Sequence, residues 1–114
     1  MSAALSPTSF WILTVLAGGR RHGYDILTET ETASQGRVTM KVTTLYAALE
    51  RLEREGLIHA DGEEIVNGRA RRYYRLAEQG TASLTAEVDA LEQQARVARE
   101  RLRGQAPTGR TALA

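Results

Sequence analysis

The sequence predicts a mainly α-helical fold with one β-hairpin, in which a compact domain at residues 1–76 precedes a single long helix at residues 77–103. Three observations support this prediction. Apolar residues recur at helical spacing in three short stretches before residue 56. Two strand-like stretches then flank an Asn67-Gly68 turn signal. From Leu84 to Leu102 the apolar residues recur in steps of four and three, a pattern typical of a helix that packs along another helix.

The composition is that of an ordinary soluble domain. The chain has 114 residues, with 15 Lys and Arg against 14 Asp and Glu, a net charge of +1 and no cysteine. The lack of cysteine excludes a disulfide scaffold and any Cys-based metal site or nucleophile. No apolar run approaches the ~20 residues that a membrane-spanning helix needs, and no export signal is evident. We therefore expect a cytoplasmic protein with no membrane contact, no metal and no cofactor.

Capping residues and glycines define the expected limits of the three short helices. Ser6 and Pro7 suit the start of the first, and Gly18-Gly19 ends it. The second runs from about His22 to Ser34, and Gly56 ends the third in a left-handed cap. The inward positions expected are Tyr24, Ile26, Leu27 and Thr30 in the second helix, and Val42, Leu45, Leu49 and Leu52 in the third.

The hairpin carries a concentrated positive charge. Its first strand begins at Leu57-Ile58 and ends near Ile65-Val66, and its second runs to Leu76. Between Asn67 and Leu76 there is no acidic residue, whereas Glu50 to Glu64 hold six. The basic side chains of the second strand are Arg69, Arg71, Arg72 and Arg75.

The long helix is expected to pack against a second copy of the chain. At 1.5 Å per residue it spans about 40 Å, whereas the preceding domain has a diameter near 30 Å. A two-fold dimer is the smallest arrangement that covers its apolar seam; the alternative is a helix that folds back onto its own domain. Beyond it, residues 104–114 lose periodicity and are expected to form a flexible tail. The seam consists of Leu84, Val88, Leu91, Ala95, Ala98 and Leu102.

Three stretches in this order resemble the PadR family of transcriptional regulators. They are His22 to Ile26, Thr44 to Ile58, and Gly68 to Leu76 with Gly80 shortly after. The resemblance implies a winged helix-turn-helix domain followed by a C-terminal dimerisation helix, as in the smaller PadR subfamily. The sequence departs from the family at Lys41 and Ala77, where capping residues are usual. Because Lys41 cannot cap, Thr39 is an alternative start for the third helix.

In this family resemblance the third helix enters the DNA major groove by its first turns and the hairpin is the wing. The alternatives are that Thr44 only supports the helix start, that Tyr46 only packs, and that the wing is a solvated face. No arginine lies near the helix start to bind guanine bidentately. The expected DNA-binding residues are Arg37, Lys41, Thr43 and Thr44, then Tyr46, Arg69, Arg71 and Arg72.

Phe10 and Trp11 are the candidate ligand-binding residues. An aromatic pair of this kind is most often part of a core or a dimer interface. The resemblance, however, implies a cavity between subunits in which some members bind flat aromatic compounds, so that a small aromatic effector could stack on Trp11.

These features favour a dimeric, ligand-responsive repressor that binds a palindromic operator of double-stranded DNA. The alternative is a small-molecule-sensing or protein-interaction dimer without operator specificity. An enzyme is not expected, because the isolated His22 and His59 have no partner at a catalytic spacing and no other nucleophile or acid–base group stands out. No catalytic residue is therefore assigned.

Overall fold

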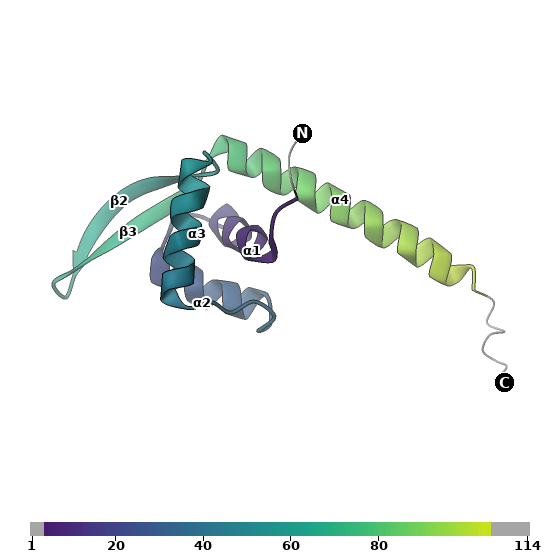
Figure 1. Ribbon diagram of the computed structural model, residues 1–114, viewed down its shortest axis with the longest axis horizontal. Helices are drawn as coiled ribbons and strands as arrows, with labels where there is room; N and C mark the ends of the chain where they lie inside the picture. Colours follow the sequence, from purple (N-terminus) through teal and green to yellow (C-terminus); the bar gives the residue numbers. More distant parts are fainter. Residues whose placement is uncertain (1–3, 106–114) are drawn as a thin grey trace.

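The computed structural model describes residues 4–105, and its elements follow the predicted order (Figure 1). They are α1 (Pro7–Ala17), β1 (Arg21–His22), α2 (Gly23–Ala33), α3 (Val42–Arg54), β2 (Ile58–Val66), β3 (Arg69–Leu76) and α4 (Glu78–Arg103). The predicted fold class is confirmed: three helices, a hairpin and a long final helix. The predicted tail, residues 104–114, lies outside the described residues from position 106 onward.

The sheet has three antiparallel strands in the order β1-β3-β2. The hairpin pairs Ile58 with Leu76 at its base and Val66 with Arg69 at its tip. The sequence did not predict β1, because two residues are too few to display a strand pattern and α2 begins directly after them. This short strand pairs Arg21 with Tyr74 and His22 with Tyr73, and it thereby attaches the base of the hairpin to the helical layer.

The caps of α1 and α2 follow the sequence. The Ser6 hydroxyl accepts the Ser9 amide at 3.1 Å, with Pro7 at the first helical position. The His22 Nδ1 accepts the Asp25 amide at 3.3 Å, so this histidine caps α2. Each cap satisfies a backbone donor that the helix itself leaves unpaired.

The alternative start of α3 at Thr39 is wrong, since the helix begins at Val42 with Lys41 as an N-cap that makes no side-chain hydrogen bond. Two contacts keep the preceding loop extended. The Ser34 hydroxyl accepts the Val38 amide at 3.0 Å, and Met40 packs against the core. The loop therefore reaches α3 two residues later than a cap at Thr39 would allow.

The core lies between the three short helices and the base of the sheet. Two residues expected inside are exposed: Tyr24 at 65% and Val42 at 54%. Each lies in the first turn of its helix, where the helix extends past the core, whereas the expected inward positions Ile26 and Thr30 are fully buried. The largest fully buried apolar side chains are Ile12, Leu13, Ile26, Leu45, Leu49, Leu52 and Ile58.

Leu57 joins the end of α3, the base of the sheet and the start of α4. Gly56, with a φ of +79°, ends α3, and the Leu57 amide then donates to the Leu52 carbonyl at 2.9 Å. The Leu57 carbonyl in turn accepts the Ala77 amide at 3.0 Å. Gly80 is buried against this carbonyl, and a Cβ at that position would clash with its oxygen. A glycine is thus required where α4 crosses the chain.

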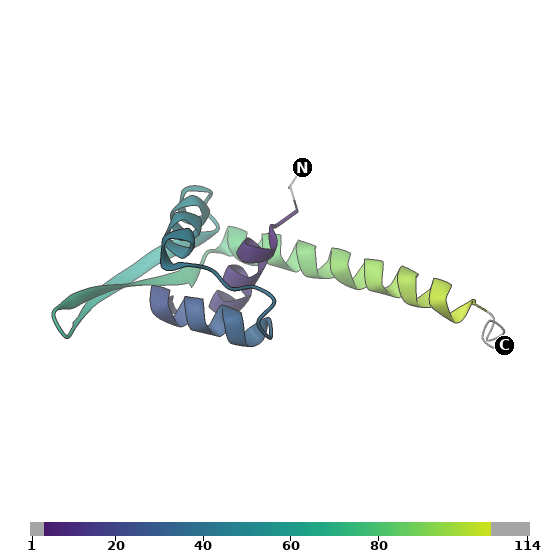
Figure 2. The same ribbon diagram turned by 60° about the horizontal axis from the view of Figure 1, so that its bottom comes forward.

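From this junction α4 packs along α1 and then projects away from the domain (Figures 1 and 2). Leu84 packs against the core, but every residue from Val88 to the end of the helix is exposed. The helix therefore does not fold back onto its own domain, and the molecule is 66 Å long. No helix in the described part of the chain is long and apolar enough to cross a membrane.

We predict that Gly80→Ala destabilises the protein although alanine favours a helix by about 1 kcal/mol over glycine. The added methyl group meets the Leu57 carbonyl oxygen, which belongs to the backbone and cannot move without breaking its bond to Ala77. We expect a net loss of about 2 kcal/mol in the free energy of unfolding, measured by denaturant titration at fixed protein concentration. Thr81→Ala, at an exposed neighbouring position, is the control and should change it by less than about 0.5 kcal/mol. A Gly80→Ala protein as stable as the parent would contradict the close crossing.

Candidate nucleic-acid interface

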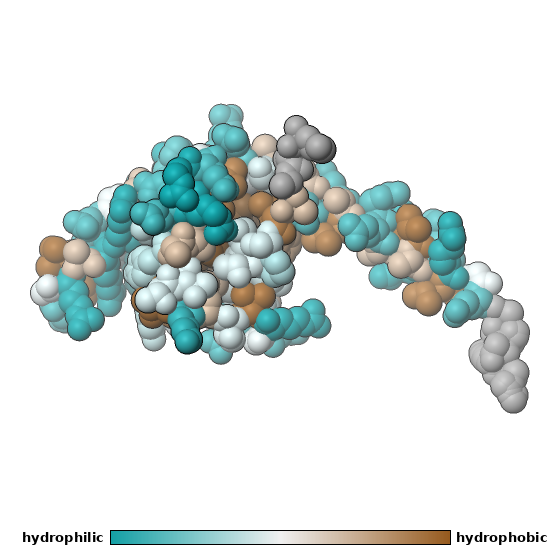
Figure 3. All heavy atoms as spheres, viewed as in Figure 1, coloured by the Kyte–Doolittle hydropathy of each residue, from teal (hydrophilic) through white to brown (hydrophobic). Residues whose placement is uncertain are grey.

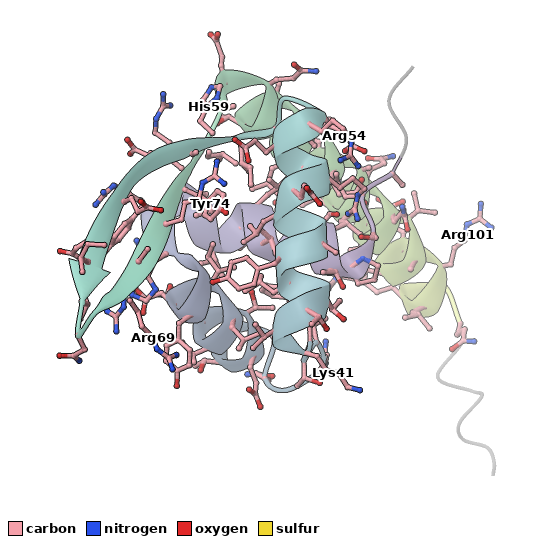
Figure 4. All side chains as sticks on the ribbon, turned by 60° about the vertical axis from the view of Figure 1, so that its left-hand side comes forward. Lys41, Arg54, His59, Arg69, Tyr74 and Arg101 are labelled. Carbon is pink, nitrogen blue, oxygen red and sulfur yellow. The ribbon has the colours of Figure 1, made fainter. Side chains whose placement is uncertain are left out.

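The first turns of α3 present polar and small side chains on the face opposite the core. Lys41, Thr43 and Thr44 are exposed there, and Arg37 is exposed in the preceding loop. Lys41 lies at one end of the helix and Arg54 at the other (Figure 4). The wing tip with Arg69 lies on the Lys41 side in the same view. The start of α3 and the wing tip are therefore directed to one side of the molecule.

Tyr46 has both a packing role and an exposed edge. Its hydroxyl and ring lie against Gly23, so closely that a Cβ at Gly23 would overlap them. Nevertheless 46% of the residue remains exposed. The tyrosine therefore braces the start of α3 against the start of α2 and still offers part of its ring to a partner.

The wing arginines lie on two different faces of β3, because alternate residues of a strand point to opposite sides. Arg72 faces α3: it donates to the Glu53 carboxylate at 3.4 Å, and its guanidinium lies 5.6 Å from the centre of the Tyr74 ring. A cleft of about 480 Å³ between α3 and the wing is lined by Tyr46, Ala47, Glu50, Glu53, Arg72 and Tyr74. Arg72 thus joins the wing to α3.

The opposite face of the hairpin carries a cluster that the sequence did not predict. The Arg20 guanidinium stacks 3.8 Å from the centre of the Tyr73 ring and its Nε donates to the Asp61 carbonyl at 3.0 Å. The pairing of β2 and β3 shifts between Ala60 and Glu63, where Gly62 has a φ of +94°. The Asp61-Gly62 dipeptide is itself a turn signal and could have identified this bulge. Together these contacts set the bend of the wing.

Two tyrosines of β3 have raised pKa values for different reasons. The Tyr73 hydroxyl donates to the Glu64 carboxylate at 2.7 Å, and this bond raises the pKa of Tyr73. Burial raises the pKa of Tyr74. Both groups stay protonated near neutral pH, so neither contributes charge to the surface.

The basic residues differ in whether they pair with a carboxylate of the same chain. Arg20, Arg21, Arg51, Arg72 and Arg75 each lie within 4.0 Å of a carboxylate. Within residues 4–105, no ion pair engages Arg37, Lys41, Arg69 or Arg71. These four exposed cations are therefore free to bind an external anion.

The remaining predicted site residues lie elsewhere. Phe10 and Trp11 are partly buried on α1 and contact edge to face, with ring centres 5.4 Å apart. Along α4, Leu91 is 43% exposed and Leu102 64% exposed, and Ala95 and Ala98 are exposed as well. Apolar side chains are visible along this helix in Figure 3. Val97 adds an exposed apolar residue that the heptad seam does not include.

One of the two histidines has a structural role and the other is exposed to solvent. His22 caps α2, and its Nε2 lies 3.2 Å from the Asp25 carboxylate, whereas His59 is exposed. In the described part of the chain, no three His, Cys, Asp or Glu side chains group as metal ligands.

Three helices, a small antiparallel sheet with a wing beside α3, and a projecting final helix define a winged helix-turn-helix protein. The chain belongs to the PadR-like family of transcriptional regulators, whose family model matches residues 12–86. The predicted resemblance is thereby confirmed. Because this is a family of regulators, the expectation that the chain is not an enzyme is confirmed as well.

Individual relatives are similar over part or most of the chain. The transcriptional regulator Rv3488 from Mycobacterium tuberculosis is 48% identical over 65 residues, which span 57% of each protein. A transcriptional regulator from Clostridium thermocellum has 27% identity and a TM-score of 0.67, with 81% of this chain and 89% of that one covered. The structure of Bacillus subtilis PadR in complex with operator DNA has 25% identity and a TM-score of 0.63, covering 70% of this chain and 45% of that one.

We predict that Tyr73 and Tyr74 ionise above the ordinary tyrosine pKa, and that Glu64→Gln lowers the pKa of Tyr73. A raised pKa in the folded state means that the Tyr73–Glu64 bond is intact below the ordinary tyrosine pKa and is lost as the pH rises through the raised value. Tyrosinate absorbance during alkaline titration measures this, with Tyr73→Phe to assign the transition. Glu63→Gln is the matched control. An unchanged Tyr73 transition in the Glu64→Gln protein would refute the hydrogen bond.

Proposed function

We propose that the protein is a dimeric regulator that binds a palindromic operator of double-stranded DNA in the cytoplasm. The observation that carries the proposal is the set of exposed cations without an ion pair in residues 4–105 at the start of α3 and on the wing: Arg37, Lys41, Arg69 and Arg71. Of these, Lys41 and Arg69 lie toward the same side in Figure 4. Phosphate contacts by such residues provide most of the affinity for DNA. The operator complex of the Bacillus subtilis relative supports DNA as the partner.

In this proposal the contacts divide by element. The first turns of α3 enter the major groove with Lys41, Thr43, Thr44 and Tyr46, while Arg37 binds an adjacent phosphate. The wing contacts the neighbouring backbone or minor groove through Arg69 and Arg71. Arg72 leaves or shares its contact with Glu53 when a phosphate approaches.

Residues 1–76 form the DNA-binding domain and residues 77–103 the dimerisation helix. Five of the six predicted seam residues lie exposed, Val88, Leu91, Ala95, Ala98 and Leu102, and burial of such surface by a second copy is favourable by about 25 cal/mol per Å². The remaining seam position, Leu84, is partly buried against the core.

Repression and its control by a ligand are the finer part of the proposal. Phe10 and Trp11 are half-buried residues of α1, and α1 is the helix against which α4 packs. A flat aromatic effector stacked on Trp11 would therefore act where the dimer helix meets the DNA-binding domain, and would shift the population of dimer geometries.

A second function is favoured by one observation. The first two turns of α3 contain no Arg, Asn or Gln for bidentate base contacts, which suits a small-molecule-sensing or protein-interaction dimer without operator specificity. Selection from random duplex sequences with the purified protein distinguishes the two: an enriched palindrome supports the regulator, and no enrichment after several rounds supports the alternative.

We predict that Arg71→Ala weakens binding to all duplex sequences and lowers the slope of log K against log salt concentration by about 1. The double variant Arg71→Ala/Arg72→Ala should weaken binding further. Fluorescence anisotropy over a salt series measures both effects. Arg101→Ala, near the far end of α4 (Figure 4), is the control with an unchanged slope. Equal affinity and slope in the double variant would show that the wing makes no phosphate contact.

A further inference from the structure

The first two turns of α3 expose apolar groups both on the outward face of the helix, at Thr43 and Ala47, and at Val42, which continues the stripe of Leu45 and Leu49 beyond the end of the core. Val42 is 54% exposed in the first turn, and Thr43 and Ala47 are exposed beside it. Thr43 and Ala47 are four residues apart and so lie on the same side of the helix, away from the buried Leu45 and Leu49. We name Val42, Thr43 and Ala47 the methyl patch.

The surroundings of the methyl patch favour DNA as its partner over another apolar surface. Lys41 directly precedes it, Arg37 lies in the loop before α3, and the wing tip with Arg69 lies on the Lys41 side of the molecule (Figure 4). These three cations carry no ion pair in the described residues 4–105. A rim of unpaired cations complements phosphates on both sides of a groove, whereas a protein surface would have to neutralise them.

The residues of α3 restrict which base edges the helix can distinguish. Guanine is read through its O6 and N7 by Arg or Lys, and adenine by Asn or Gln. Residues 42–47 are Val, Thr, Thr, Leu, Tyr and Ala, which offer no such fork, so that Lys41 at the N-cap is the one residue at this end of α3 that could bind guanine. Glu50, in the next turn, carries only acceptors and so cannot bond to the acceptors of guanine.

The thymine C5-methyl is the base group in the major groove that an apolar patch can recognise. We propose that Val42, Thr43 and Ala47 bind thymine methyl groups, and that the base pairs under the methyl patch are specified by thymine. This inference rests on the proposed function, since it names the bases that the operator must contain. In this proposal Val42 and Ala47 determine sequence specificity through apolar contact, although neither side chain carries a charge or forms hydrogen bonds.

The test replaces each thymine of the selected half-site in turn by deoxyuridine, which keeps the base pair and removes only the methyl group. Each methyl under the patch should cost about fourfold in affinity, the value for one buried methyl-sized group. Replacement of thymines outside the half-sites is the control and should leave affinity unchanged. Competition binding at fixed salt measures both.

Val42→Ala locates the contact. Since Val42 is exposed and outside the core, this variant should unfold at the same denaturant concentration as the parent. It should bind the thymine operator about fourfold more weakly than the parent does. When the thymine that Val42 contacts is replaced by deoxyuridine, the affinity of the variant should not fall further. If no deoxyuridine replacement changed the affinity for the operator, or if the selected half-site contained no thymine, this inference would be overturned while the proposed function would stand. A protein that binds no duplex would instead overturn the proposed function.

Discussion

The position of every proposed surface depends on the carbonyl group of Leu57. At this residue α3 has just ended at Gly56, β2 begins, and β3 returns to donate the Ala77 amide. Gly80 lets α4 cross against the same carbonyl. One peptide group thus fixes both the angle of the wing beside α3 and the direction in which α4 leaves the domain. This shared junction would hold the proposed DNA-contacting face and the proposed dimer helix in a constant relation.

Contacts on both faces of the hairpin hold the wing. Arg72 and Tyr74 attach one face to α3, while Arg20 stacks on Tyr73 at the bulge on the other. A single exposed ion pair of this kind contributes about 0–1 kcal/mol to stability. The position of the wing therefore depends on the contacts of both faces together and not on one ion pair. Because these arginines are engaged within the chain, the unpaired cations at the start of α3 and on the wing are Arg37, Lys41, Arg69 and Arg71. The other cations without an ion pair in residues 4–105 are Arg54, at the far end of α3, and Arg96, Arg99, Arg101 and Arg103 on α4. The net charge of +1 therefore describes a narrow basic surface on a nearly neutral molecule.

Much of the architecture could be predicted because local rules act strongly at particular residues. Ser6-Pro7, Gly56 and Asn67-Gly68 mark element boundaries through backbone geometry, and the 4-3 spacing after Leu84 identifies a helix that outruns its domain. Tyr24 and Val42 were misplaced because periodicity cannot locate where a core ends along a helix. The Arg20–Tyr73 stack was missed because it joins residues 53 positions apart through β1, a strand too short to have a pattern. The contact of Arg72 with Glu53 was missed because the sequence does not show which face of the hairpin lies against α3.

The distance between the two α3 helices of a dimer tests the central claim most directly. The chain has no cysteine, so a spin label on Lys41→Cys reports a single exposed site in each copy. A two-fold dimer built on α4 predicts a dipolar distance of roughly 34 Å, one turn of DNA, and Leu91→Glu in the same labelled protein should abolish the coupling. No coupling in the parent at micromolar concentration, or a distance far from a whole DNA turn, would contradict the arrangement of α3, the wing and α4 derived from the Leu57 junction.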